Sequence, residues 1–187
     1  MAIVPRRYRF TVDEYERMAE VGVLTQCDRV ELLDGEIVEM TPIGNRHASV
    51  VARVSSVFSK RLGDRVIVWA QNPVQLRVVR SMPQPDVALV RPRTDFYAAG
   101  KPGPDDVLLL IEIMDTSAET DRRVKLPLYA RAGITETWLL DLTTDRVEVF
   151  RRPTSAGYGE VMTLERNTRL SPHAFPDLVL TVDDLLG

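Results

Sequence analysis

Cysteine and histidine are scarce in this chain of 187 residues, and their scarcity excludes two common kinds of site. Cys27 is the only cysteine, so neither an internal disulfide nor a zinc cluster built on thiolates is possible. Since His47 and His173 are the only histidines, a histidine-rich metal site is excluded as well. Any metal that this chain binds should therefore be held by oxygen ligands, which suits magnesium, manganese or calcium.

Long apolar runs are missing too. None approaches the roughly 18–20 residues that a membrane span needs. The basic segment 1–10 is not followed by an apolar signal region. We therefore expect a cytoplasmic protein with no membrane partner. Hydrophobic residues still make up 44% of the chain, which predicts a packed core, and the length suits a single domain over residues 1–187.

Positive charge is limited as well, since the net charge is −3. This argues against a protein that coats nucleic acid through bulk positive charge, although it is compatible with an enzyme whose basic residues are local. Lysine is particularly rare, with only Lys60, Lys101 and Lys125. A lysine at a chemically suggestive position is therefore informative.

The first half of the chain predicts helices around a hairpin. Thr11-Val-Asp-Glu14 is a capping-box pattern that should begin a helix. Asp34-Gly35 lies between two apolar runs, which is a strong hairpin signal. Valines at helical spacing, followed by Gly63, indicate a longer helix. The expected elements are helices over 12–20 and about 46–62, and hairpin strands over 29–33 and 36–40.

The second half predicts a sheet with one crossover helix. The almost wholly apolar segment 107–114 is typical of a central strand covered on both faces. Because Pro127 cannot lie deep inside a helix, the crossover helix should begin near Arg123 or Val124 and end at Gly133. Further strands are expected over 66–69, 74–79, 86–90, 137–142, 146–151 and 160–165, and a helical turn over 182–186. This order predicts an α/β (α+β) fold with a central mixed sheet flanked by helices.

Glu112 is the most informative residue, because it interrupts the apolar strand 107–114. An ionised carboxylate in a buried strand costs several kcal/mol unless it is paired or binds a metal. A plainer explanation is a strand-end carboxylate that pairs with an arginine or turns out to solvent. The pattern alone leaves both explanations open.

Asp86 and Lys125 become informative when they are considered together with Glu112. Asp86 follows Pro85 at the mouth of a strand, where an aspartate is also ordinary turn chemistry. If the strands of Asp86 and Glu112 are neighbours, the two acids could converge on one cation. Lys125 begins a helix, where a solvated position is usual. Beside two carboxylates and a metal, however, its ammonium could orient water and stabilise charge on a phosphate.

Three further residues carry weaker signals. Glu31, in the hairpin, is either a surface acid or part of the site. His47 lies at a helix start, where capping or packing is the common role. Tyr129 is one turn after Lys125, so both could share a helix face, with packing as the expected role of Tyr129.

Taken in order, these segments resemble the Uma family of predicted endonucleases in the PD-(D/E)XK nuclease superfamily. The resemblance is nearly full-length, from Phe10 to Leu186, and depends on the order and spacing of several short motifs. These motifs are Val30-Glu-Leu-Leu-Asp-Gly-Glu36 with His47, Gln84-Pro-Asp-Val87, Leu110-Ile-Glu-Ile113, Asp121-Arg-Arg-Val-Lys-Leu-Pro-Leu-Tyr-Ala130 and Ala132-Gly-Ile-Thr-Glu-Thr-Trp-Leu-Leu-Asp141.

The resemblance implies a restriction-endonuclease-like core with an N-terminal hairpin extension. Asp86 would be the aspartate of the PD motif and Glu112 the acid of the (D/E)XK motif. Met114 stands where that motif has lysine, and Lys125 matches a lysine displaced to the following helix. Glu31 and His47 match the acid of the first hairpin and the histidine before the first long helix.

The resulting hypothesis is metal-assisted hydrolysis of DNA. We expect a homodimer, because a duplex has two strands to cut and symmetric dimers are common. Asp86 and Glu112 would hold Mg²⁺ or Mn²⁺, while Lys125 acts on the nucleophile and Glu31 adds a direct or water-mediated ligand. The arginines expected to contact backbone phosphates are Arg122, Arg123 and Arg131. The alternatives are a non-catalytic nucleic-acid-binding module, and a structural core in which Asp86 and Glu112 lie far apart.

Overall fold

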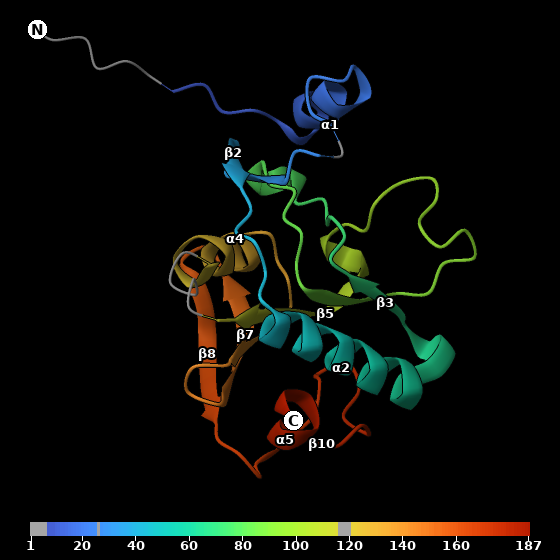
Figure 1. Cartoon of the computed structure of the whole chain (residues 1–187), viewed down its shortest axis with the longest axis vertical. Helices are drawn as coiled ribbons and strands as arrows, with labels where there is room; N and C mark the ends of the chain where they lie inside the picture. The colour runs from blue at the N-terminus through green and yellow to red at the C-terminus, as the bar shows by residue number, and fades with distance from the viewer. Residues whose placement is uncertain (1–6, 26, 116–120) are drawn as a thin grey trace, which may run out of the picture.

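A six-stranded mixed sheet forms the centre of the computed structural model, which describes residues 7–25, 27–115 and 121–187 (Figure 1). The strands lie in sequence order across the sheet, and only β5 and β6 pair in parallel. They are β3 (Ile67–Ala70), β4 (Val87–Val90), β5 (Val107–Met114), β6 (Glu136–Asp141), β7 (Arg146–Thr154) and β8 (Gly157–Leu164). The parallel pair requires a crossover, which the helix after β5 provides.

Helices cover both faces of this sheet. One face packs against α2 (Asn45–Leu62) and the short α5 (Val182–Leu186), whose apolar residues share a core cluster with Ile111 and Ile113. The other face packs against α4 (Leu126–Arg131), in a cluster with Leu110 and Met114. Because side chains alternate along a strand, Glu112 points to the α4 side.

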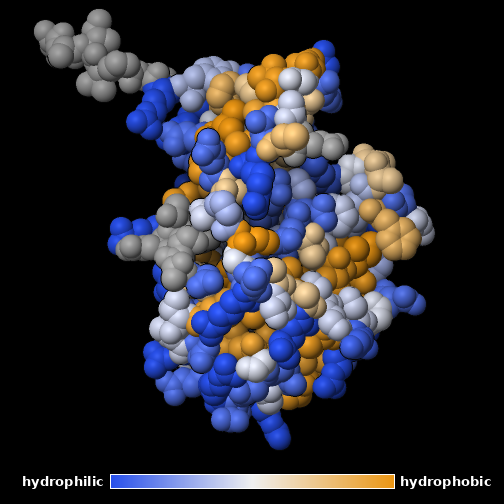
Figure 2. All heavy atoms as spheres, in the orientation of Figure 1, coloured by the Kyte–Doolittle hydropathy of each residue, from blue (hydrophilic) through white to orange (hydrophobic). Residues whose placement is uncertain are grey.

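The N-terminal segment forms a smaller layer above the sheet (Figure 1). The capping box of Thr11 and Glu14 begins α1 (Val12–Glu20), which packs on the hairpin of β1 (Val30–Leu33) and β2 (Glu36–Glu39). Their shared core contains Val12, Tyr15, Leu32 and Met82. Apolar side chains also reach the surface over this layer (Figure 2). Val21 and Val23 are among the exposed apolar residues of the N-terminal segment.

The sequence predicted most of these elements within a residue or two, but the strand expected over 74–79 is wrong. Val74, Leu76 and Val79 are buried in the core, yet Arg77–Val79 forms a 3₁₀ turn, η2. The chain then reverses, and Ser81 N donates to the Leu76 carbonyl. These apolar residues fill the space beneath the hairpin and do not pair in the sheet. The prediction failed because β-propensity reports how well residues fit a half-buried surface, and not whether they pair.

Short elements that the sequence did not predict complete the fold. They are η1 (Gly63–Arg65), η3 (Pro104–Asp106), β9 (Arg169–Leu170) and β10 (Leu180–Thr181). The predicted crossover helix is present as the π-helix η4 (Asp121–Lys125) followed directly by α4. Within the described ranges, no helix combines the length and apolar character that crossing a membrane would require.

Candidate metal-dependent active site

The sheet brings Asp86 and Glu112 together. Asp86 directly precedes β4, Glu112 lies near the end of β5, and the register pairs Val87 with Ile111. The backbone N–H of Asp86 donates to Glu112 Oε2 at 3.2 Å. The two acids are therefore neighbours across two antiparallel strands, so the expectation that they lie far apart is wrong.

Helix α4 holds the other oxygen of Glu112. The Tyr129 hydroxyl donates to Glu112 Oε1 at 2.5 Å, and Lys125 Nζ lies 3.6 Å from the same oxygen. The Glu112 residue is only 3% exposed and Tyr129 is fully buried. A carboxylate this buried needs such partners, since an unpaired charge would be expensive to desolvate.

Lys125 joins Glu112 to the hairpin. Its ammonium lies 3.2 Å from Glu31 Oε1, and the backbone N–H of Gln84 donates to Glu31 Oε2 at 3.1 Å. Lys125 is 6% exposed and Glu31 is 5% exposed. Neither is the solvated surface residue that its local pattern allowed.

His47 completes the group from the first turn of α2. Its Nε2 lies 2.9 Å from Asp86 Oδ2, which also accepts a hydrogen bond from the backbone N–H of Ile113 at 2.8 Å. Burial opposes protonation of His47, but the hydrogen bond to Asp86 and the charges of Asp86 and Glu112 outweigh it. The pKa of His47 is consequently raised above its ordinary value.

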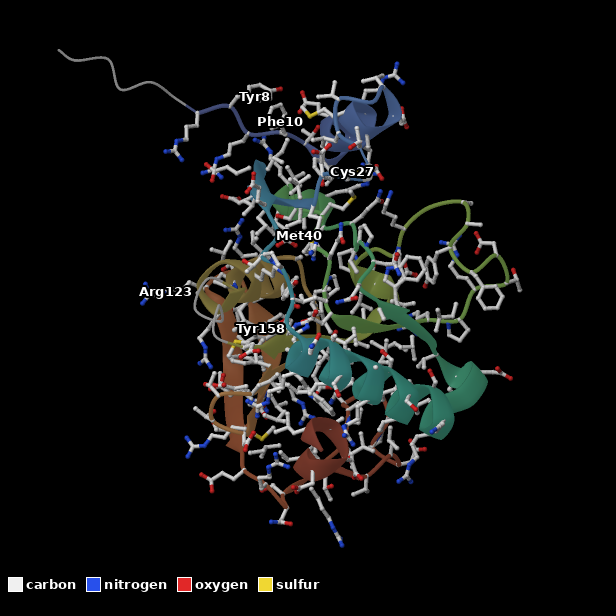
Figure 3. The ribbon with its side chains drawn as sticks, viewed as in Figure 1. Tyr8, Phe10, Cys27, Met40, Arg123 and Tyr158 are labelled. Carbon is white, nitrogen blue, oxygen red and sulfur yellow. The ribbon has the colours of Figure 1, made fainter. Side chains whose placement is uncertain are left out.

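One cavity of about 540 Å³ is lined by all five predicted site residues, which are Glu31, His47, Asp86, Glu112 and Lys125. The hairpin and the segment 40–44 form its other walls, and Met40 lies between the hairpin and α2 (Figure 3). Two more acids, Glu39 and Asp115, also line the cavity. Among the described residues that line the cavity, five carboxylates thus face one lysine and one histidine, so these residues carry excess negative charge.

Comparison with known families identifies the family to which this sequence belongs. The model of the Uma2 family, described as "Putative restriction endonuclease", matches residues 12–183. The chain belongs to the Uma2 family. The expected resemblance is thus confirmed over nearly the whole sequence. A comparison with curated proteins finds no match.

A solved structure shares the fold. It is described as a putative nuclease belonging to DUF820 from Anabaena variabilis, and it superposes with a TM-score of 0.73 at 17% identity. The alignment covers 95% of this chain and 97% of that one. The predicted α/β fold with a central mixed sheet is therefore confirmed, and the similarity extends through the N-terminal layer.

The three arginines assigned to phosphate contacts do not line the cavity of this Uma2 protein. Arg122 forms an ion pair with Glu148, with 3.1 Å between Nη1 and Oε1, and Arg131 pairs with Asp34 at 3.2 Å. Arg123 is exposed and extends outward beside α4 (Figure 3). The structure therefore brings together the five acid, lysine and histidine residues, but not these arginines.

Three features of the site were not predicted from the sequence. Packing was the role expected of Tyr129, which also donates to Glu112. Gln84 contributes a backbone N–H to Glu31, and Asp115 lines the cavity. Only Tyr129 had a usable signal, because its spacing of four from Lys125 places both on one helix face.

Proposed function

We propose that this Uma2 protein is a divalent-metal-dependent endonuclease that hydrolyses DNA phosphodiester bonds. The observation that carries the proposal is the acid-rich cavity, in which Asp86 and Glu112 are adjacent and Lys125 lies beside Glu112. A phosphodiester is an anion, so this cavity would repel it unless a bound cation offsets the carboxylates. The excess negative charge thus supports a cation at this position.

The donor set fits magnesium or manganese. Both ions prefer oxygen ligands, and Mg²⁺ is commonly held by one or two carboxylates with water completing the coordination. Asp86 and Glu112 supply two such carboxylates. The Asp86 hydrogen bonds to His47 and Ile113 both use Oδ2, so Oδ1 is directed to neither of them. The backbone carbonyl of Ile113 would be a third oxygen ligand.

Each protein residue then has a distinct role. When bound, the metal would supply Lewis-acid polarisation of the phosphate and a more acidic water. Lys125 would position the attacking water and stabilise negative charge that develops on the phosphate. Glu31, fixed by Gln84, would orient Lys125, and His47 would orient Asp86.

One observation is consistent with the alternative of a non-catalytic nuclease-fold module. Among the residues that the structure describes, no group of three or more His, Cys, Asp or Glu side chains is arranged to hold a metal ion. A site of two carboxylates plus backbone and water ligands satisfies this observation equally well. Direct measurement of metal binding separates the two functions.

DNA as the substrate follows from the description of the family, and a homodimer would allow both strands of a duplex to be cut. The defining experiment is nicking of supercoiled plasmid with Mg²⁺, with Mn²⁺ and with EDTA. We expect cleavage that requires the metal and disappears in Asp86→Asn. The matched control is Asp105→Asn, an exposed acid in η3, which should cut as the parent does. Equal cleavage by Asp86→Asn would refute the assignment of Asp86.

A calorimetric titration of Mn²⁺ into the parent separates a different substrate from a missing metal site. Binding without plasmid cleavage would keep the metal site and direct the search to RNA and branched DNA. No binding, with or without DNA, would favour the non-catalytic module.

A further inference from the structure

We infer that Tyr129 is a positioning residue that orients Glu112 for metal binding. The inference rests on the proposed function, because it assigns a role within the same site. Tyr129 is fully buried on α4, and its hydroxyl donates to Glu112 Oε1 at 2.5 Å. The hydroxyl is thus directed at a proposed metal ligand from inside the core.

The two oxygens of Glu112 are held on opposite sides. Oε1 faces α4, where it meets Tyr129 and Lys125. Oε2 faces Asp86, whose backbone N–H donates to it at 3.2 Å. With Oε1 held by Tyr129, Oε2 is directed to the backbone N–H of Asp86, the residue whose carboxylate would share the cation.

Lys125 alone would not hold this orientation. Its ammonium lies 3.6 Å from Glu112 Oε1 and 3.2 Å from Glu31 Oε1, so it is shared between at least these two carboxylates. The Tyr129 hydroxyl donates to Glu112 Oε1 from a fully buried position on α4. A charge-assisted O–H···O⁻ bond of this kind is strong and directional, which suits it to fixing a carboxylate rotamer.

Fixing the ligand has a measurable consequence for metal affinity. Loss of a hydrogen-bonding partner that orients a metal ligand typically weakens metal binding by about 10- to 100-fold. Tyr129→Phe removes one oxygen atom and keeps the ring that packs in the core with Leu110 and Ile134. The variant therefore separates the hydrogen bond from the packing.

The chain provides a matched control in Tyr97. This tyrosine is also buried, and its hydroxyl donates to the Arg91 carbonyl at 2.8 Å, away from the lining of the cavity. Tyr97→Phe therefore loses the hydroxyl hydrogen bond of a core tyrosine without touching Glu112.

The test is calorimetric titration of Mn²⁺ into the parent, Tyr129→Phe and Tyr97→Phe, with a thermal melt of each protein. We expect the Mn²⁺ dissociation constant to rise about 10- to 100-fold in Tyr129→Phe and less than about twofold in Tyr97→Phe. Plasmid cleavage by Tyr129→Phe should recover at high Mn²⁺ concentration, because the lost function is affinity.

Other outcomes overturn the inference in distinguishable ways. Equal Mn²⁺ affinity in the parent and Tyr129→Phe would leave the metal site in place and remove the positioning role. Unchanged affinity with cleavage that stays low at saturating Mn²⁺ would assign Tyr129 to the chemical step instead. A parent that binds no Mn²⁺ would overturn the proposed function and the role of Tyr129 together. If Tyr129→Phe melts far below Tyr97→Phe, the hydroxyl is structural and the inference fails.

Discussion

At the scale of single residues, a substitution of Lys125 should separate metal binding from DNA cleavage most clearly. Lys125 lies between Glu31 and Glu112 and lines the cavity, so it affects both the fold and the site. We expect Lys125→Met to keep binding Mn²⁺, because both proposed metal ligands remain. Cleavage should fall about 100- to 1,000-fold through loss of one preorganised donor. Mn²⁺ titration and plasmid nicking measure the two effects separately.

Lys101→Met is the control for Lys125→Met, since Lys101 pairs with Glu16 at 2.7 Å outside the cavity. Lys101→Met should retain both Mn²⁺ binding and plasmid cleavage. Removing Lys125 also leaves Glu31 and Glu112 without their shared cation, so we expect a lower melting temperature in metal-free buffer than for Lys101→Met. Undiminished cleavage by Lys125→Met would show that the lysine has no part in the reaction.

Glu136 is a buried charge that does not line the cavity and should stabilise the fold through its partners. Glu136 is fully buried at the start of β6 and accepts from Arg151 Nε at 2.8 Å, from Trp138 Nε1 and from the His173 backbone. Arg151→Ala would leave this carboxylate without its cation and should lower the free energy of unfolding by about 3–5 kcal/mol. Urea denaturation measures the change.

The neighbouring Arg152 offers a control for that prediction. Its ion pair with Glu160 is exposed on the Arg152 side, so Arg152→Ala should change the stability by less than about 1 kcal/mol. Similar losses of stability in Arg151→Ala and Arg152→Ala would mean that burial does not increase the contribution of the Glu136–Arg151 pair.

At the scale of elements, the C-terminal helix α5 depends on its cap. Asp184 accepts hydrogen bonds from the backbone N–H and hydroxyl of Thr181, and these bonds lower the pKa of Asp184. A carboxyl whose folded pKa lies below its unfolded pKa stabilises the fold above the unfolded value, and this contribution is lost as the pH falls through the folded value. Asp184→Ala should therefore cost about 0.3–1.5 kcal/mol at neutral pH.

The difference between the parent and Asp184→Ala should shrink between about pH 5 and pH 3. Denaturation at several pH values tests this, with the exposed acid Asp64 in η1 as the Asp64→Ala control. A stability difference that stays constant over the whole range would contradict the role of the ionised Asp184.

The same scale shows what the sequence could predict. The capping box of Thr11, the pair Asp34-Gly35 and the apolar segment 107–114 are local signals. Helix α1, the hairpin and β5 form where those signals lie. The segment 74–79 has the composition of a strand, but its place beneath the hairpin is decided by tertiary packing. Local composition reports burial more reliably than it reports pairing partners.

At the scale of the whole molecule, the site depends on segments that are distant in sequence. Glu31 comes from the hairpin, His47 from α2, Asp86 and Glu112 from two strands, and Lys125 from the crossover helix. No spacing rule predicts this convergence, because it depends on strand order and on which face each element presents. The family resemblance provided the set, and the structure shows that its members share one cavity.

A cation at this convergence would link the strands through Asp86 and Glu112, and should stabilise the protein as a whole. A ligand present at about 100 times its dissociation constant adds roughly 2.7 kcal/mol to the stability of the state that binds it. For a chain of this size, that corresponds to a rise of roughly 5–10 °C in melting temperature. We expect Mn²⁺ to raise the melting temperature of the parent by about this amount and EDTA to reverse the rise.

Asp86→Asn should melt at the same temperature with and without Mn²⁺, because it removes a charged ligand while keeping the size of the side chain. Asp105→Asn, with its carboxylate outside the cavity, should show the full rise of the parent. A rise of equal size in Asp86→Asn would place the stabilising ion elsewhere on the molecule. Agreement of the melting and titration results in all three proteins would tie global stability to the carboxylate pair at the edge of β4 and β5.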